Sequence, residues 1–268
     1  MRRFFSAING NKKLSVHPSA RVTISDAAKH LTGRIQVGRD STLKIEDGAV
    51  IASDLTIGDA CSVVLKSYSR VQDTDFRIEQ NGNFELGEGA IINSPVSKPS
   101  AITINNGTLR IERRAHVMST EILVRFGGQM TIGRYTGIAY RSEIRCEERV
   151  EIGSYGMISY DVCIYDTNTH SVDWRERRKR IEACYPEGVM EVTKPATSPV
   201  LIGDDVWIGK EVAITKGANI GHRCIIGIRT IIGSETVPDD SIVVAGKPRI
   251  IPRRLDQNDP ASVIELIT

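Results

Sequence analysis

An aliphatic residue recurs at every sixth position over long stretches of this sequence. In "LIGDDVWIGKEVAITKGANIGHRCIIGIRTII" the spacing holds without a slip through six isoleucines: Ile202, Ile208, Ile214, Ile220, Ile226 and Ile232. A helix places apolar residues at three- and four-residue spacing, and a half-buried strand places them at every second residue. A period of six fits neither, so we expect the chain to turn a corner once in each repeat.

Two further runs keep the same period. They are Ile45, Ile51, Ile57 and Val63, and then Ile132, Ile138, Ile144 and Val150, after which Ile152, Ile158 and Ile164 resume the count with a two-residue shift. Many repeats carry Gly directly after the aliphatic residue, as in "IGRY", "IGSY", "IGDD" and "IGHR". We expect these glycines to supply the backbone conformations that a tight corner requires. Three repeats then close a triangular coil, and stacked coils bury one aliphatic column, which predicts an all-β fold, a parallel β-helix.

Composition limits the classes of function. The 268-residue chain is 40% hydrophobic and 25% charged, as globular proteins are, and its low aromatic content of 5% suits a narrow prism. Its 35 basic and 33 acidic residues nearly cancel, so any anion-binding site must be local. No apolar run approaches the roughly 20 residues of a membrane span. The opening "MRRFFSAINGNKKL" lacks the features of a signal peptide, so we expect a cytoplasmic protein.

The cysteines predict neither disulfides nor a metal site. They are odd in number and none belongs to a Cys-x-x-Cys pair: Cys61, Cys146, Cys163, Cys184 and Cys224. Disulfide frameworks and zinc sites need paired or closely spaced cysteines. We therefore expect buried free thiols and no bound metal.

Residues 130–254 resemble the left-handed β-helix acyltransferases of the hexapeptide-repeat family, in particular the sugar and surface-polysaccharide O-acetyltransferases. The stretches "IGDDVWIGKEVAITKGANIG" and "VPDDSIVVAGKPRIIPRR" carry this resemblance. The left hand comes from the resemblance alone, because parallel crossovers are generally right-handed. The resemblance also implies acetyl-CoA as the acyl donor, and a homotrimer with each active site between neighbouring subunits.

The repeat suggests a division of the chain into regions. We assign residues 1–14 to an N-terminal segment, 15–129 to irregular β-helix coils, 130–254 to the acyltransferase-type helix and 255–268 to a C-terminal tail. A long catalytic loop, residues 166–199, is inserted between coils. Long connections in compact folds are usually functional or disordered, and a histidine in this one favours function.

His170 is the candidate catalytic base. In the family that the chain resembles, the base is a histidine near the start of a loop upstream of a Trp-Ile-Gly repeat, and His170 occupies that place. A neutral imidazole, with a pKa near 6.5, can take the proton of an acceptor hydroxyl, and an activated thioester then needs no enzyme nucleophile. Asp166 or Asp173 either orients the ring or is a solvated loop acid. We expect surface or packing roles for the remaining histidines: His17, His30, His116 and His222.

The resemblance implies that acetyl-CoA lies along the C-terminal coils with its thioester end near Trp207, although Trp207 could instead pack between loop and coil. Beside Gly227 the family has small residues along the pantetheine arm, whereas "GIRTIIG" places Ile228 and Arg229 there. The cations that either bind the coenzyme phosphates or form a solvated cap are Lys210, Lys216, Lys247, Arg249, Arg253 and Arg254.

The acceptor side departs from the simple sugar enzymes of the family. Galactoside and maltose enzymes carry an asparagine where this chain has Ala139, followed by Tyr140 and Arg141. We expect acceptor contacts from Tyr140, Arg141, Asp173 and Trp174; Arg141 suits a carboxylated or phosphorylated glycan, or is an exposed structural residue.

The predicted function is O-acetylation of a bacterial surface polysaccharide, such as a capsule or O-antigen, or of its sugar precursor. The alternatives are N-acylation of a nucleotide-linked amino sugar, and a non-catalytic β-helix that serves as a scaffold or binding module.

Overall fold

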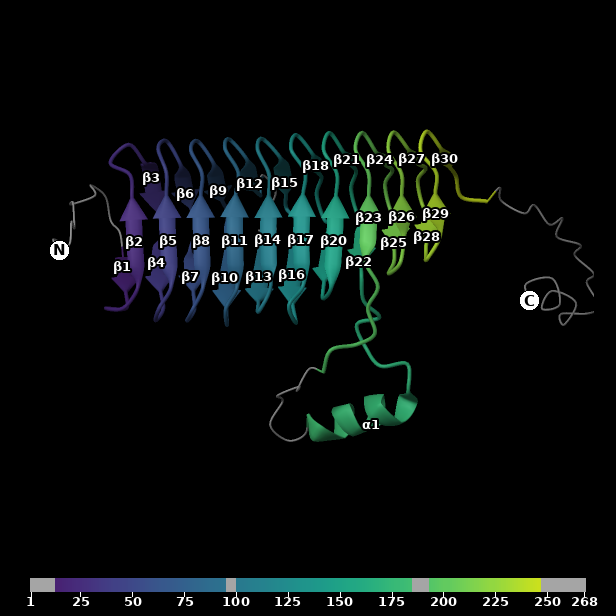
Figure 1. Cartoon of the computed structure of the whole chain (residues 1–268), viewed down its shortest axis with the longest axis horizontal. Coiled ribbons are helices and arrows are strands. Elements are labelled where there is room, and N and C mark those ends of the chain that lie inside the picture. The colour runs from purple at the N-terminus through teal and green to yellow at the C-terminus, as the bar shows by residue number, and fades with distance from the viewer. Residues whose placement is uncertain (1–12, 95–99, 185–192, 247–268) are drawn as a thin grey trace, which may run out of the picture.

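The computed structural model describes residues 13–94, 100–184 and 193–246. Within these ranges the chain forms three parallel ten-stranded sheets that it visits in turn along one axis (Figure 1). We name them sheets A, B and C in the order of their first strands. The prediction of an all-β parallel helix is confirmed.

The strands of each sheet stack in chain order. Sheet A contains β1 (Lys13–Val16), β4 (Arg34–Val37), β7 (Leu55–Ile57), β10 (Thr74–Glu79), β13 (Ser100–Asn105), β16 (Glu121–Arg125), β19 (Glu143–Cys146), β22 (Cys163–Tyr165), β25 (Ala213–Ile214) and β28 (Ile231–Ile232). Sheet B contains β2 (Arg21–Ile24), β5 (Thr42–Ile45), β8 (Ser62–Leu65), β11 (Asn83–Leu86), β14 (Thr108–Ile111), β17 (Gln129–Ile132), β20 (Arg149–Ile152), β23 (Val200–Ile202), β26 (Asn219–Ile220) and β29 (Thr236–Val237). Sheet C contains β3 (Lys29–Thr32), β6 (Val50–Ala52), β9 (Arg70–Gln72), β12 (Ile91–Asn93), β15 (His116–Met118), β18 (Gly137–Ile138), β21 (Met157–Ile158), β24 (Trp207–Ile208), β27 (Ile225–Ile226) and β30 (Ile242–Val243).

The coil is left-handed. In Figure 1 the strands of sheet B face the viewer and point up, those of sheet C lie behind and point down, and the chain advances from left to right. This agrees with the family resemblance and departs from the usual hand of parallel crossovers. The three edges of the prism are named by the sheets that they join: the BC edge lies at the top of Figure 1, the AB edge at the bottom and the CA edge at the rear.

The length of the coil changes along the axis. Near the C-terminal end Leu201 pairs with Asn219, eighteen positions later, as three six-residue repeats require. In earlier coils Thr42 pairs with Ser62 and Asn83 with Thr108, so these coils hold twenty and twenty-five residues. The sheets run unbroken across residue 130. The separate role of residues 15–129 stays a prediction.

The core is a continuous column of inward-pointing aliphatic side chains. Strand residues alternate between buried and exposed: in β7, Leu55 and Ile57 are buried and Thr56 is exposed. The isoleucines of the six-residue count lie inside. The early coils are wider and add two phenylalanines, Phe76 and Phe84, whose ring centroids lie 4.7 Å apart. Each buried aliphatic or aromatic side chain stabilises the fold by about 1.5–3 kcal/mol, so most of the stability comes from this column.

The glycines that follow the aliphatic residues act differently from the sequence-based expectation. The left-handed backbone conformation at the BC edge belongs to residues two positions later, such as Tyr155 (φ 59°) and Asp205 (φ 58°). Gly153 instead lies where the backbones of successive coils approach most closely. A Cβ there would lie 2.4 Å from the carbonyl of Gly203. These glycines are required by close backbone stacking, and the expectation that they supply unusual φ angles is wrong.

All five cysteines are free thiols. Cys61, Cys146 and Cys224 are buried, as expected, whereas Cys163 and Cys184 are half-buried. Burial raises the pKa of the Cys146 thiol, which keeps it protonated. In the described part of the chain no helix has the length and apolar character needed to cross a membrane.

Candidate functional site

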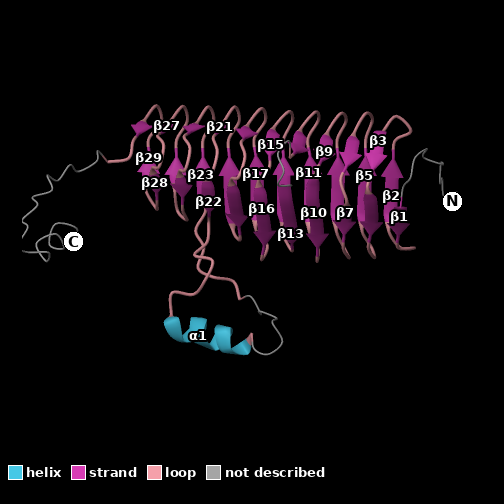
Figure 2. Cartoon of the chain, turned by 180° about the vertical axis from the view of Figure 1, so that it is seen from behind, coloured by secondary structure: helices cyan, strands magenta, loops and turns pink. Residues whose placement is uncertain are grey.

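Among the coils that the structure describes, one excursion interrupts the stack. The chain leaves the prism after Tyr165 of β22 and rejoins it at Val200 of β23, so the excursion starts and ends at the AB edge (Figures 1 and 2). Its far part holds helix α1 (Trp174–Ala183), none of whose residues is buried. Its two arms pair through an antiparallel bridge between Thr167 and Thr197. The excursion is therefore a two-armed stem that carries a helix away from the prism.

Asp166 fixes the base of this stem. Its side chain is fully buried, and its carboxylate accepts backbone N–H groups of Glu147 at 2.8 Å, Glu148 at 2.7 Å and Arg149 at 2.7 Å. Burial raises the pKa of Asp166, whereas the three N–H donors favour its charged form. Asp166 is thus a structural anchor, and the sequence-based suggestion that it orients His170 has no contact to support it.

A second buried carboxylate extends the anchor and was not found from the sequence. Glu147 is fully buried and pairs with Arg125, whose Nε and Nη2 lie 2.6 and 2.5 Å from Oε1. Thr167 Oγ1 donates a hydrogen bond of 2.8 Å to the other oxygen of Glu147, and it accepts the N–H of Thr169 at 3.0 Å. The network ends one residue before His170. Its only sequence signal is a charged residue at the end of a strand, which many surface positions share.

His170 lies exposed at the start of the outgoing arm. Its Nδ1 is 3.1 Å from Nη1 of Arg180 on α1. A guanidinium can only donate, so this contact requires the lone pair on Nδ1 and the proton on Nε2. While the contact lasts, neither ring nitrogen can take a proton from a substrate. Base catalysis by His170 therefore requires Arg180 to move away.

Asp173 and Trp174 begin the helix. Asp173 is the N-cap residue, and its Oδ1 accepts the N–H of Arg175 at 2.8 Å. Two cations contact the Trp174 ring: the guanidinium carbons of Arg175 and Arg178 each lie 4.8 Å from its centroid. Both residues stabilise α1, and neither contacts the imidazole of His170 in this structure.

Trp207 lies on a different side of the prism. It opens β24 of sheet C with 53% of its surface exposed, and it pairs with Met157 and Ile225 in the neighbouring strands. Sheet C is the face opposite the AB edge, from which the excursion carrying His170 leaves. The two residues that the resemblance assigns to one reaction are not brought together within one subunit.

The CA edge gathers four of the expected residues, but their charges are already paired. Arg141 forms two hydrogen bonds with Asp161, of 2.7 and 2.9 Å, which lower the pKa of that carboxyl. Lys210 lies 3.0 Å from Glu211, which also binds Arg229 at 2.5 Å. Tyr140 stacks on the ring of Tyr160, with centroids 5.7 Å apart. Asp161 and Glu211 thus pair with the cations of this edge, Arg141 among them.

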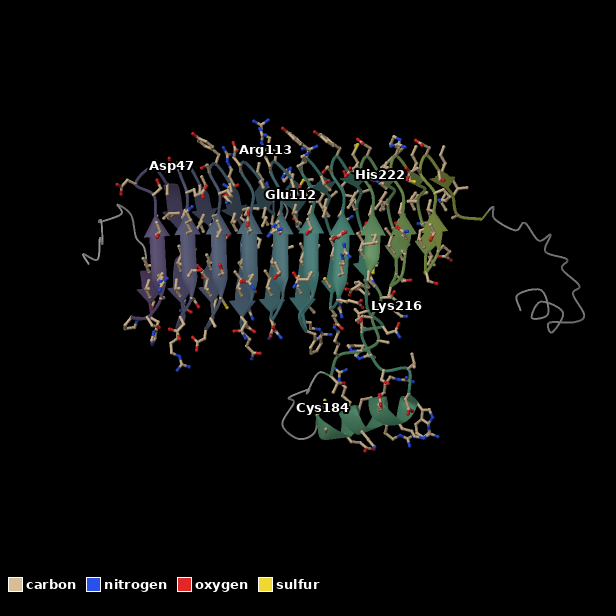
Figure 3. All side chains as sticks on the ribbon, in the orientation of Figure 1. Asp47, Glu112, Arg113, Cys184, Lys216 and His222 are labelled. Atoms are coloured by element: carbon tan, nitrogen blue, oxygen red, sulfur yellow. The ribbon has the colours of Figure 1, made fainter. Side chains whose placement is uncertain are left out.

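The remaining coenzyme candidates that the structure describes lie at two different edges of the prism. Gly227 and the exposed Ile228 share the CA edge with Arg229. Lys216 lies instead at the AB edge beside the excursion, as Figure 3 shows. Four of the expected cations fall outside the described residues: Lys247, Arg249, Arg253 and Arg254.

A shallow groove of about 540 Å³ runs over sheet B toward the BC edge. Its ionisable lining is Glu112, Glu151, Asp204, Asp239 and His222. His222 Nδ1 accepts the backbone N–H of Asp204 at 2.9 Å (Figure 3 shows the ring at this edge). The acidic lining does not suit coenzyme phosphates. Among the described residues no group of His, Cys, Asp and Glu could hold a metal ion.

No profile of a known protein family matches the chain, and no curated protein sequence does. Among solved structures, a hexapeptide-repeat acetyltransferase, VCA0836 of Vibrio cholerae O1 biovar eltor, complexed with acetyl coenzyme A, is 26% identical over 46% of this chain, at a TM-score of 0.37. The match spans about 60% of the length of that protein.

Two other solved structures match over almost the whole chain. The polySia-specific acetyltransferase NeuO is 18% identical over 96% of this chain and 91% of its own, at a TM-score of 0.42. The polysialic acid O-acetyltransferase OatWY is 16% identical over 95% of this chain and 98% of its own, at a TM-score of 0.43. The chain is a left-handed β-solenoid of hexapeptide repeats, and these structural neighbours are acetyltransferases.

Proposed function

We propose that this protein is an acetyl-CoA-dependent O-acetyltransferase that modifies a hydroxyl of a bacterial surface polysaccharide or of its sugar precursor, in the cytoplasm. The observation that carries the proposal is the excursion at the AB edge. It interrupts an otherwise regular stack and presents an exposed histidine on a stem with a buried anchor. The motifs of residues 130–254, which resemble those of the O-acetyltransferases, support the same reaction.

In the proposed reaction His170 acts as general base. Its imidazole removes the proton of the acceptor hydroxyl while the hydroxyl oxygen attacks the carbonyl carbon of the thioester. The tetrahedral intermediate then expels the coenzyme thiolate, which takes the proton back from the imidazolium. Base assistance of this kind accelerates reactions by about 10²–10⁴-fold. The Arg180 contact must open first, because it occupies the lone pair of Nδ1 and keeps the proton on Nε2.

We further propose that the protein works as a homotrimer with shared sites. One prism is convex, and His170 and Trp207 lie on different sides of it, so one subunit cannot enclose both substrates. Exclusion of water protects an acetyl thioester from hydrolysis. No residue of α1 is buried in the chain, and Trp174 and Ile181 are 49% and 61% exposed, which suits a helix that packs against a neighbouring subunit.

In such a trimer the coenzyme lies along the CA edge of one subunit. Trp207 contacts the thioester end, Gly227 lines the path of the pantetheine arm, and Lys210 and Arg229 bind phosphates in exchange for their bonds to Glu211, with Lys247 and Arg253 as further candidates. The acceptor contacts Tyr140, Arg141, Asp173 and Trp174.

Labelled acetyl-CoA provides the test of the activity. We expect label to appear in a base-labile ester of the acceptor glycan, detected by mass spectrometry. Base-stable label would indicate N-acylation instead. If calorimetry detects no binding of acetyl-CoA, the result would favour a non-catalytic scaffold and contradict the proposal.

Mixed assemblies test the shared site. We expect His170→Ala subunits to be inactive and Trp207→Ala subunits to be impaired by themselves, whereas a mixture contains sites that combine the intact residue of each. We expect the mixture to recover part of the wild-type rate, and sedimentation to give a trimer. A mixture as inactive as its components, or an active monomer, would exclude shared sites.

A further inference from the structure

The excursion contains a pocket that none of the expected site residues lines. It has a volume of about 520 Å³ and lies between one face of α1 and the returning arm. Its described lining consists of Ser171, Glu176, Arg177, Lys179, Arg180, Ala183, Thr193 and Lys194. We call it the α1 pocket. Because it includes Ser171 and Arg180, it adjoins His170 directly.

The described lining of the α1 pocket is strongly positive. Four cations face one carboxylate, that of Glu176. Within the described residues, none of these four cations lies within 4.0 Å of an acidic side chain, in contrast to Arg141, Lys210 and Arg229 at the CA edge. Clustered cations without counterions raise one another's energy and attract anions.

The walls of the pocket are held in place by the backbone. Arg177 Nη1 donates to the carbonyl oxygens of Ser171 and Val172, both at 2.8 Å, so its guanidinium closes the start of the helix against the outgoing arm. The N-cap bond of Asp173 fixes the same corner. The remaining cations, Lys179 and Lys194, are exposed and can adjust to a ligand.

Arg180 carries a group that lacks a partner. Its Nε is buried from solvent and has no hydrogen-bond acceptor in the described structure. A buried donor without a partner is destabilising, and an anion in the pocket would supply the acceptor. A planar guanidinium can bind a carboxylate or phosphate group through two parallel bonds, here from Nε and Nη2, the nitrogens that do not contact His170.

We propose that the α1 pocket binds a carboxylate or phosphate group of the acceptor saccharide, so that the acceptor is an anionic glycan. The proposal rests on the proposed function, because it places the acceptor beside the base. It places anion recognition at cations that have no acidic side chain within 4.0 Å among the described residues, whereas Arg141 is paired with Asp161.

Inorganic phosphate is a suitable probe for the full-length protein. Calorimetry at constant ionic strength, which holds screening fixed, measures its affinity for the wild type and for the double variant Lys179→Gln/Lys194→Gln. We expect the variant to bind phosphate at least about fivefold more weakly, since each cation contributes roughly 0.5 kcal/mol or more. The matched control is Arg175→Gln/Arg178→Gln, which removes the same number of charges from α1 at positions that do not line the pocket. It should leave the affinity unchanged.

Three outcomes would overturn the proposal. They are wild-type protein that binds no phosphate, equal weakening by both double variants, and displacement of phosphate by acetyl-CoA. The last would assign the pocket to the coenzyme phosphates. We expect instead that phosphate binds equally well with and without saturating acetyl-CoA. If the protein binds phosphate in the pocket but never binds acetyl-CoA, the anion site stands and the acetyltransferase function fails.

Discussion

The coils before the excursion and those after it share one core but differ on the outside. Before it, outward positions of β10 carry Asp75 and Arg77, which pair with each other at 2.9 Å. After it, outward positions carry Trp207, Ile231 and Ile242, with 53%, 74% and 70% of their surface exposed. Charged side chains remain stable in water, whereas large exposed apolar side chains gather at binding surfaces. Trp207 and Ile242 lie on sheet C and Ile231 on sheet A, so we expect two sides of the late coils to meet other molecules.

Coil length follows the same division. The late coils have seventeen or eighteen residues and strands of two or three, whereas the early coils are longer and their strands reach six residues. A two-residue strand has one inward-pointing residue, so the type and spacing of that residue can vary little. This explains why the six-residue count runs longest without a slip from Ile202 to Ile232.

The largest expected effect distinguishes histidines of the two regions. His170→Ala should lower the rate of acetyl transfer by about 10²–10⁴-fold, because the proton acceptor is lost. His116→Ala, in β15 of the early coils, should leave the rate unchanged, since that ring is half-buried against Asn93 and remote from the excursion. Transfer from labelled acetyl-CoA measures both. Equal loss in the two variants would remove the functional distinction between the regions.

The anchor of the excursion should be sensitive to the loss of one charge. Arg125→Gln leaves the buried carboxylate of Glu147 without its cation, and breaking such a pair costs about 3–5 kcal/mol. Arg39→Gln, in an exposed pair with Asp59 of the early coils, should leave the urea midpoint unchanged. Urea unfolding followed by circular dichroism compares the two. A stable Arg125→Gln protein would show that Glu147 is not the anchor.

The outward apolar residues of the late coils should govern assembly. Ile231→Lys combined with Ile242→Lys should weaken self-association at least about tenfold, because charges would be buried without partners. Thr103→Lys makes a similar change at an outward position of β13 in the early coils and should have no effect. Sedimentation over a range of concentrations provides the measurement. If the double variant associates as strongly as the wild type, Ile231 and Ile242 do not form the contact between subunits.

The smallest effect concerns the aromatic residues of the BC edge. Tyr135 and Tyr155 stack with centroids 5.2 Å apart and planes 4° from parallel. Tyr155→Ala should reduce stability by about 0.5–1.5 kcal/mol. Tyr68 occupies the same edge in an early coil without a ring partner in the described structure, and Tyr68→Ala should cost less. Thermal unfolding measures the loss of stability in both variants. Equal losses would show that the stacked pair of Tyr135 and Tyr155 does not stabilise the protein.

Much of the fold could be predicted from the sequence. One aliphatic residue points inward from each side of a coil, so the six-residue count predicts the triangular coil, the parallel sheets and the aliphatic column. The break after Ile164 gave the position of the excursion, and His170 was identified within it by resemblance. The reason offered for the glycines was wrong, because close contact between Gly153 and Gly203 depends on stacking across fifty residues of chain.

The charge environment of the candidate site was decided by the tertiary structure alone. Asp161 neutralises Arg141 because one coil of twenty residues places them in the same column of the CA edge. Glu147 and Asp166 become an anchor only when the excursion folds back on β19, and α1 brings Arg180 onto His170. Burial in a repeat is a local property, since every coil repeats the same inward positions. Pairing of charges instead depends on which outward residues of successive coils lie beside each other. Where the coils vary in length, the sequence alone does not predict which residues these are.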